Sequence, residues 1–343
     1  MSTGEGILPL SGYLDAAWKA VEHFPVDATE IEPVMQSENV TFRVTDRAGG
    51  RRYVLRLHRP GYNTIEELES ERIWVEALKE TGVPVPGSLE TCRGGHFTLI
   101  DIQGSDEQRF AGMTTWHEGE PLGNFLQSCT DASERKQMFH RFGEIAAAFH
   151  NQSAGWRAPP GFTRRKLGIE NLLGEAPFWG RFWEHPELNK SEQALLLGVR
   201  DSLRVALEAY GEQPGKFSMI HADFTPDNII YDGCHLAVID FDDCAFGWHL
   251  YDIASLLTEC TLYPDFVELQ DALFDGYRLH RKLTQQDAGL LSDFLLVRGM
   301  AVIGWFYQRP EHAGAKEFHD VKRWVLDQCA ARAAISPAGA EAP

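Results

Sequence analysis

A short stretch of the chain combines residue types that could transfer a phosphoryl group. Asp223 stands two residues after His221, Asn228 follows five residues later, and Asp240 comes twelve residues after that, at the end of the apolar segment 236–239. Kinases use a proton-accepting carboxylate, a metal-binding amide and a metal-binding carboxylate in this order. The spacing therefore predicts an ATP-dependent phosphotransferase.

Each of these residues would have a defined task. Moving a γ-phosphoryl group requires a positioned hydroxyl and neutralised charge more than covalent help from the protein. Asp223 would orient the attacking hydroxyl and receive its proton, while Asn228 and Asp240 offer the hard oxygen ligands that Mg²⁺ prefers. The alternative is that these carboxylates only cap turns and end a strand. Their combined spacing beside an apolar strand favours the catalytic interpretation.

Two neighbouring residues are expected to support this loop. His221 precedes the predicted base, and we expect its ring to hold the turn and not to react. Asp252 begins the next predicted helix. It could cap that helix, or it could tie down the catalytic loop, and the sequence leaves both interpretations open.

Composition and charge narrow the class of protein. The 343 residues suffice for two lobes, and 43% hydrophobic with 24% charged residues is typical of a globular protein. A formal net charge of −18 argues against a nucleic-acid partner. Residues 1–9 lack the apolar core of a signal peptide, and the apolar stretch 294–307, interrupted by Arg298, is too short for a bilayer. We expect a cytoplasmic protein with no membrane partner; its oligomeric state is not predicted.

Hydrophobic periodicity divides the chain into a sheet-rich and a helix-rich part. Apolar residues at helical spacing predict a leading helix over 14–24 and another helix over 65–81. Strands are predicted over 32–36, 40–46, 53–58, 88–92, 96–102 and 110–116. A Gly and a Pro within 117–122 predict a hinge. Helices are then predicted over 134–152, 191–210, 264–282 and 286–308.

The sequence resembles, over most of its length, the aminoglycoside phosphotransferase and choline kinase superfamily. The likeness rests on HADFTPDNIIYDG at 221–233 and VIDFDDCAFGWHLYDIA at 238–254. It is similar to the branch with homoserine kinase type II, hydroxylysine kinase and SrkA/RdoA-type kinases. The resemblance implies an α+β, protein-kinase-like two-lobed fold that uses ATP and Mg²⁺. We expect a nucleotide-binding lobe over 1–116, a helical catalytic and substrate lobe over 117–335, and a flexible tail over 336–343.

The resemblance also implies the nucleotide contacts. They are Ser37 and Asn39 in the first hairpin turn, Arg56 on the third strand, Glu71 as the acid that pairs with the third-strand cation, and Met113, Trp116, His117 and Glu118 around the adenine. The family often has Lys where this chain has Arg56, and a planar guanidinium would contact phosphates differently. The alternative for Arg56 is an outward strand residue paired with Glu38 or a neighbouring acid. Trp116 could equally be a core residue.

The acceptor is expected to be a small hydroxylated molecule, such as an amino alcohol, a hydroxylated amino acid or an aminoglycoside-like compound. Only eleven residues separate Asp240 from Asp252, which leaves no room for a protein-kinase activation loop. A Ser/Thr protein kinase of the stress-response type and a non-catalytic nucleotide-binding pseudokinase remain the alternatives. Intact Asp223, Asn228 and Asp240 argue against the pseudokinase.

The segment 161–183 is the most unusual part of the predicted helical lobe. It contains five large aromatic residues together with Arg164, Arg165 and Arg181. It could cover the substrate, in which case the arginines would favour a carboxylate-bearing acceptor, or its aromatics could simply pack in the core. The acids near the predicted base, Asp227, Asp242 and Asp243, would instead favour an amine.

Overall fold

The computed structural model describes residues 10–312 and 315–335, so the predicted tail at 336–343 lies outside the described residues. The chain forms two compact units. The first comprises Met1–Leu122, Ala158–Arg164 and Ile229–Asp242, and the second comprises Gly123–Arg157, Arg165–Asn228 and Asp243–Pro343. Asp240 therefore belongs to the first unit, whereas Asp223 and Asn228 belong to the second.

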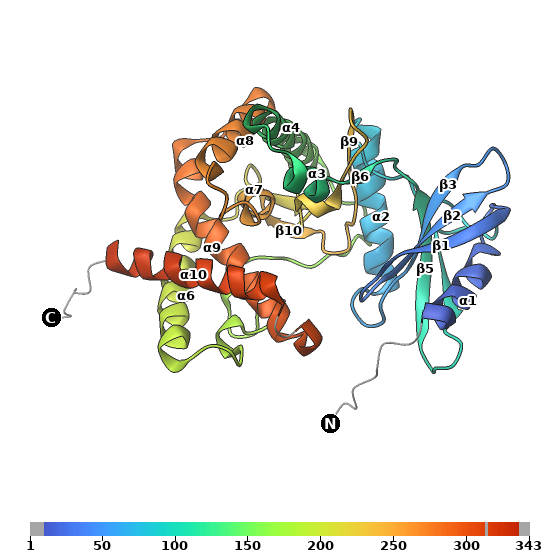
Figure 1. Cartoon of the computed structure of the whole chain (residues 1–343), viewed down its shortest axis with the longest axis horizontal. Helices are drawn as coiled ribbons and strands as arrows, with labels where there is room; N and C mark the ends of the chain where they lie inside the picture. Colours follow the sequence, from blue (N-terminus) through green and yellow to red (C-terminus); the bar gives the residue numbers. More distant parts are fainter. Residues whose placement is uncertain (1–9, 313–314, 336–343) are drawn as a thin grey trace. The chain divides into compact units, whose positions relative to one another are not determined.

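A five-stranded antiparallel sheet forms the body of the first unit (Figure 1). Its order is β1 (Ala28–Gln36), β2 (Val40–Asp46), β3 (Arg52–Leu57), β5 (Gln108–Thr115) and β4 (Phe97–Asp101). In β2 every second residue, Val40, Phe42 and Val44, is buried, as expected for a strand with one face against a core. The predicted alternation is thus confirmed there.

The strand predicted over 88–92 is wrong, apart from an isolated bridge between Ser88 and Thr114. Its backbone N–H groups go to three separate places, because Leu89 donates to Met113, Thr91 to the turn residue Gly95, and Cys92 to His23. A ladder needs one continuous partner strand. The segment therefore connects elements without joining the sheet.

Two helices and a small second sheet complete the first unit. Helix α1 (Leu10–Val21) packs small buried residues against the large sheet. Helix α2 (Ile65–Glu80) starts at a capping box formed by Thr64 and Glu67. The small sheet pairs β6 (Glu120–Pro121) with β8 (Ile229–Tyr231), and β8 with β9 (Leu236–Val238). Strand β9 ends two residues before Asp240.

The second unit is mainly helical. Its longer helices are α4 (Ala132–Gly155), α6 (Lys190–Tyr210), α7 (His249–Thr258), α8 (Phe266–His280), α9 (Gln285–Tyr307) and α10 (Lys316–Ile335). The short helices are α3 (Leu122–Ser128), whose first residue belongs to the first unit, and α5 (Ile169–Leu173), and the strands β7 (Phe217–Ile220) and β10 (Ala245–Trp248) pair with each other. All ten residues of α7 are buried. The predicted α+β class, with a sheet-rich and a helical part, is confirmed.

Close contacts between helices hold the second unit together. Helices α4 and α8 touch backbone to backbone, because a Cβ atom added to Gly143 would lie 2.0 Å from the Leu273 carbonyl oxygen, and one added to Gly276 would lie 1.9 Å from that of His140. Helix α9 packs against α7 and α10. It is long and apolar enough to cross a membrane, but 67% of its apolar window is buried inside the protein, as in a core helix.

Candidate active site

The loop between β7 and β8 carries Asp223 and Asn228. The Asn228 amide nitrogen donates to the Asp223 carbonyl oxygen at 2.8 Å and to Asp223 Oδ2 at 2.9 Å. Arg298, on α9, donates to Asp223 Oδ1 from the other side. The Asp223 side chain remains 34% exposed, so a fixed carboxylate reaches the surface of the second unit.

The charge on Asp223 is set by these neighbours. Burial acts to raise the pKa of Asp223, but the charges of Arg298 and His221, with the hydrogen bonds from Arg298 and Asn228, outweigh it and hold the pKa below its usual value. Asp223 is therefore ionised at neutral pH. An ionised carboxylate can accept the proton of a hydroxyl group.

Asp252 fixes the start of this loop. Its carboxylate accepts hydrogen bonds from the backbone N–H groups of His221, at 2.9 Å, and Ala222, at 2.8 Å. The alternative interpretation as a helix cap is wrong, because the N-cap of α7 is Trp248. Burial raises the pKa of Asp252 to about 6, against the lowering effect of His221 and these amides.

The backbone of the loop is held in a costly conformation. Ala222 has a φ of 69°, in the left-handed region that side-chain-bearing residues rarely adopt. The His221 ring is fully buried and stacks on Phe224, with ring centroids 5.4 Å apart. Packing and the two bonds to Asp252 together keep the strained turn in place.

Asp240 lies in the first unit and pairs with Arg56. The Arg56 Nη1 atom donates to Asp240 Oδ1 at 2.7 Å, and the Arg56 side chain is only 19% exposed. The alternative of an outward-facing Arg56 paired with Glu38 is wrong, since Glu38 forms an ion pair with Arg59. Asp240 itself has a φ of 62°, so both predicted acids lie at or beside a left-handed residue.

Glu71 does not form the direct ion pair with Arg56 that the resemblance implies. Its carboxylate lies 3.8 Å from Arg164 Nη1. Burial raises the pKa of Glu71 to about 7, with Asp242 and Asp240 adding to the effect and Arg164 and Arg56 opposing it. Arg56 instead bonds to Asp240, which lies two residues beyond β9 in a left-handed backbone conformation.

The Arg164 side chain is buried in the first unit, where it bonds to backbone carbonyl groups. Its guanidinium donates to the carbonyl oxygens of Asp242, at 2.7 Å, and Glu67, at 3.2 Å. The alternative in which Arg164 would bind a carboxylate on the acceptor is therefore wrong. The same holds for Arg181, which forms a surface ion pair with Glu184.

Asn39 and Asp242 form a partly buried polar cluster that the sequence did not reveal. Asn39 donates its amide to Asp242 Oδ2 at 3.1 Å and accepts the Arg59 N–H at 2.9 Å. Asn63 donates to Asp242 Oδ1 at 2.9 Å. Both Asp242 oxygens are thus occupied within the first unit, and Asp242 is not the amine-binding acid that the sequence suggested. The nearby Ser37 hydroxyl donates weakly to the Asn39 carbonyl, at 3.4 Å.

The residues expected around adenine lie at the end of β5 and just beyond it. Met113 is 1% exposed and belongs to the apolar core under the large sheet. Trp116 is only partly buried, with the Arg43 guanidinium 5.7 Å from its ring, so it is not a core residue. Burial lowers the pKa of His117, and Glu118 forms an ion pair with Arg52.

The aromatic residues of 161–183 pack in the core. Trp179, Phe182 and Trp183 are buried, and Phe178 lies under the Arg165 guanidinium at 4.2 Å. This agrees with the packing interpretation. The functional residue that sequence reasoning missed is Arg298; its signal was a single cation inside the apolar stretch 294–307, since a buried arginine requires an acidic partner.

An antiparallel-sheet unit, a helical unit and a loop with an ionised aspartate next to an asparagine define a phosphotransferase with a protein-kinase-like fold. The chain matches the model of the phosphotransferase enzyme family, APH, over residues 30–288, and it belongs to this family. The family that the sequence resembles and the predicted enzyme class are thus confirmed.

Several known proteins are similar to this chain. A structure of a microcompartment-associated aminopropanol kinase is 30% identical, with a TM-score of 0.78 over 92% of this chain and 95% of that one. An amicoumacin kinase in complex with AMP-PNP, Ca²⁺ and Ami is 20% identical, with a TM-score of 0.74 over 91% and 92%, and shares the fold. A homoserine kinase of Pseudomonas aeruginosa is 30% identical over 227 residues, which cover 65% of this chain and 62% of the relative.

Proposed function

We propose that this enzyme transfers the γ-phosphoryl group of Mg-ATP to the hydroxyl of a small acceptor that also carries an amine. The observation that supports this most directly is the state of Asp223. Its carboxylate is ionised, each oxygen has a fixed partner, and a third of the side chain is still exposed. A carboxylate with these properties can orient an acceptor hydroxyl and take its proton.

Each of the two predicted metal ligands offers an oxygen atom that suits a hard divalent cation. The Asn228 nitrogen is used by Asp223, which leaves the amide oxygen as the free ligand atom. Asp240 offers a carboxylate whose Oδ1 is bonded to Arg56. Amide and carboxylate oxygens are the ligands of Mg²⁺, which when bound would neutralise phosphate charge. The amicoumacin kinase structure, with its AMP-PNP and Ca²⁺, supports nucleotide and divalent-metal use in proteins of this fold.

Acidic side chains near Asp223 favour an amine on the acceptor. Burial and repulsion from Asp223 raise the pKa of Asp227. The charges of Asp227 and Asp223 also act to raise the pKa of Glu259, an exposed residue at the C-cap of α7. Such mutual repulsion marks a negative potential that an ammonium group would relieve. The name of the similar aminopropanol kinase points to the same acceptor class.

A carboxylate on the acceptor is less favoured. Arg164 and Arg181 are engaged in other contacts. Arg165 lies over Phe178 and 3.7 Å from Asp243. These arginines therefore have roles that do not require an anionic substrate.

The test is a comparison of three matched acceptors with Mg-ATP. Aminopropanol has both groups, propanol lacks the amine, and propylamine lacks the hydroxyl. We expect ADP release and a phosphomonoester signal in ³¹P NMR with aminopropanol, a KM at least tenfold higher with propanol, and no turnover with propylamine. Equal kcat/KM for aminopropanol and propanol would contradict the amine preference. Nucleotide binding without turnover on any hydroxylated acceptor, protein serine included, would contradict the enzyme assignment.

A further inference from the structure

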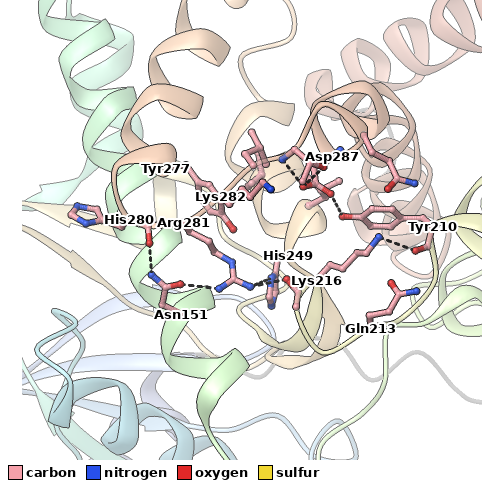
Figure 2. Close-up of a pocket in the computed structure, with 16 residues that line it drawn as sticks. Asn151, Tyr210, Gln213, Lys216, His249, Tyr277, His280, Arg281, Lys282 and Asp287 are labelled. Atoms are coloured by element: carbon pink, nitrogen blue, oxygen red, sulfur yellow. Dashed lines mark hydrogen bonds between the residues drawn. The ribbon is translucent and has the colours of Figure 1, made fainter.

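The second unit contains a pocket of about 500 Å³ that the proposed reaction does not use (Figure 2). Its wall is formed by the end of α8, the start of α9, the segment before β7 and the first residues of α7. Among the lining side chains are those of Lys216, His249, Tyr277, Arg281, Lys282 and Asp287. Three of them are permanent cations and one is an acid.

Both carboxylate oxygens of Asp287, the acid in this pocket, already accept hydrogen bonds from other residues. Asp287 accepts the Tyr210 hydroxyl on Oδ1 at 2.8 Å, and on Oδ2 it accepts the Thr284 backbone N–H at 2.8 Å as the partner in the α9 capping box. Within residues 10–312 and 315–335, no carboxylate lies within 4.0 Å of the charged atoms of Lys216, Arg281 or Lys282. The pocket therefore holds three cations against one carboxylate, and that carboxylate acts on Lys216 only at longer range.

Neutral groups hold two of these cations in place. The Arg281 guanidinium donates to Asn151 Oδ1 at 2.8 Å, to the Gly215 carbonyl at 2.7 Å and to His249 Nδ1 at 3.3 Å, as Figure 2 shows in part. The Lys216 ammonium donates to the Tyr210 carbonyl at 3.1 Å and lies 3.9 Å from the centre of the Tyr210 ring. Fixed donors of this kind bind oxyanions without first losing side-chain freedom.

A chain of hydrogen bonds leads from the pocket wall to the catalytic loop. The Tyr277 hydroxyl lies 2.9 Å from His150 Nδ1, and His150 Nε2 lies 3.4 Å from Asp252 Oδ2. The same Asp252 oxygen accepts the His221 N–H, two residues before Asp223. The pocket and the loop thus share one polar network.

The two histidines in this network are neutral. Burial lowers the pKa of both His150 and His249 well below the usual value, and their rings stack 4.3 Å apart. A neutral His150 accepts from Tyr277 on Nδ1 and donates from Nε2 to Asp252. The charge of Arg281 acts on both Tyr277 and His150, so neutralising Arg281 would change the network that holds Asp252.

We propose that the pocket around Arg281 binds a small oxyanion, phosphate or carboxylate, and that its occupancy is coupled to the catalytic loop through Tyr277, His150 and Asp252. The site is distinct from Asp223 and does not depend on which acceptor the enzyme uses. Its coupling to the loop is an interaction free energy between two sites and is therefore measurable.

Binding is tested on the full chain with saturating AMP-PNP and Mg²⁺, so that the nucleotide site is filled. Inorganic phosphate and malonate are titrated separately by calorimetry at constant ionic strength, which separates the two oxyanion types. We expect one site for at least one probe, and about tenfold weaker binding in Arg281→Gln and in Lys216→Gln, since each loses a charge-assisted contact. Arg278→Gln, which removes an exposed cation from the same helix, is the matched control and should bind like the wild type. Unchanged affinity in a folded Arg281→Gln protein, or no binding of either probe, would overturn the proposal.

Coupling is tested by hydrogen exchange of the peptide that contains His221 and Ala222, with and without the probe that binds. We expect the probe to change amide exchange there by at least about twofold in the wild type but not in Arg281→Gln. His150→Phe, at a position that does not line the pocket, should bind the probe within twofold of wild type yet lose the exchange change, because it lacks the ring nitrogens that contact Tyr277 and Asp252. An exchange change that persists in His150→Phe, or that is missing in the wild type, would show that the network does not connect the pocket to the loop. These readouts need no turnover, so their failure is distinguishable from failure of the proposed kinase activity.

Discussion

Arg298 donates a hydrogen bond to Asp223, although the two residues lie 75 positions apart in the chain. Arg298 is 9% exposed and lies on α9, within its apolar and mostly buried second half. The charge of Arg298, together with the hydrogen bonds that Arg298 and Asn228 donate to Asp223, keeps Asp223 ionised despite burial. The base that the sequence predicts is thus tuned by a cation that the motif does not contain.

Replacing Arg298 by glutamine should impair the base without removing it. Burial would then raise the pKa of Asp223, with only the weaker effects of His221 and Asn228 left to oppose it. Since the base must be ionised, the acid limb of kcat/KM should move to higher pH, so the loss of activity should be largest at acid pH and less than about tenfold at pH 7. A pH profile checks both effects, with Arg278→Gln as the surface control. A slower enzyme with an unshifted acid limb would mean that Arg298 has only a packing role.

Asp223→Asn should abolish most turnover and leave nucleotide binding nearly intact. The amide has the shape of the carboxylate but cannot accept a proton, so we expect kcat to fall by about 10³-fold or more. The Kd for AMP-PNP with Mg²⁺, measured by calorimetry, should stay within about threefold of the wild type. Substantial activity in this variant would show that another group receives the proton.

The elements with clear local periodicity were predictable. Strands such as β2 and helices such as α6 display their pattern in a few consecutive residues, and the structure contains both. The prediction of a strand over 88–92 was wrong because the backbone partners of this segment, Met113, Gly95 and His23, come from three different parts of the chain. Sequence pattern reports local preference, and it does not report where tertiary partners lie.

In the candidate site, too, some features could be predicted from the sequence and others could not. The spacing of Asp223, Asn228 and Asp252 singled out residues that the structure brings together in the second unit. The pairing of Arg56 with Asp240, and not with Glu71, depends on a segment that joins the first unit from far along the chain. Such a pairing needs the three-dimensional arrangement, as does the link between Arg298 and Asp223.

Glu71→Gln should remove a pH-dependent weakness of the protein. The pKa of Glu71 in the folded state, about 7, is above its ordinary value, so its contribution to stability is fully present at low pH and is lost as pH rises through about 7. Glutamine does not ionise. From pH 5 to pH 8, the unfolding free energy of the variant relative to the wild type should therefore increase, by up to about 3 kcal/mol.

Urea unfolding at the two pH values measures this difference. Glu76→Gln, on the same helix and paired with Lys79 at the surface, is the matched control and should show no comparable increase. A constant difference between Glu71→Gln and wild type across this interval would mean that Glu71 ionises at its ordinary pKa.

Asn39→Ala separates two roles for the first hairpin turn. If the side chain mainly holds Asp242 and the Arg59 N–H, as its bonds at 3.1 and 2.9 Å indicate, its loss leaves two buried polar groups without this partner. That should cost about 1–3 kcal/mol of unfolding free energy. Ser37→Ala, which removes only a weak exposed hydrogen bond in the same turn, should change stability by less than about 0.5 kcal/mol. If Asn39→Ala instead weakens AMP-PNP binding while unfolding is unchanged, Asn39 acts on the nucleotide, as the family resemblance implied.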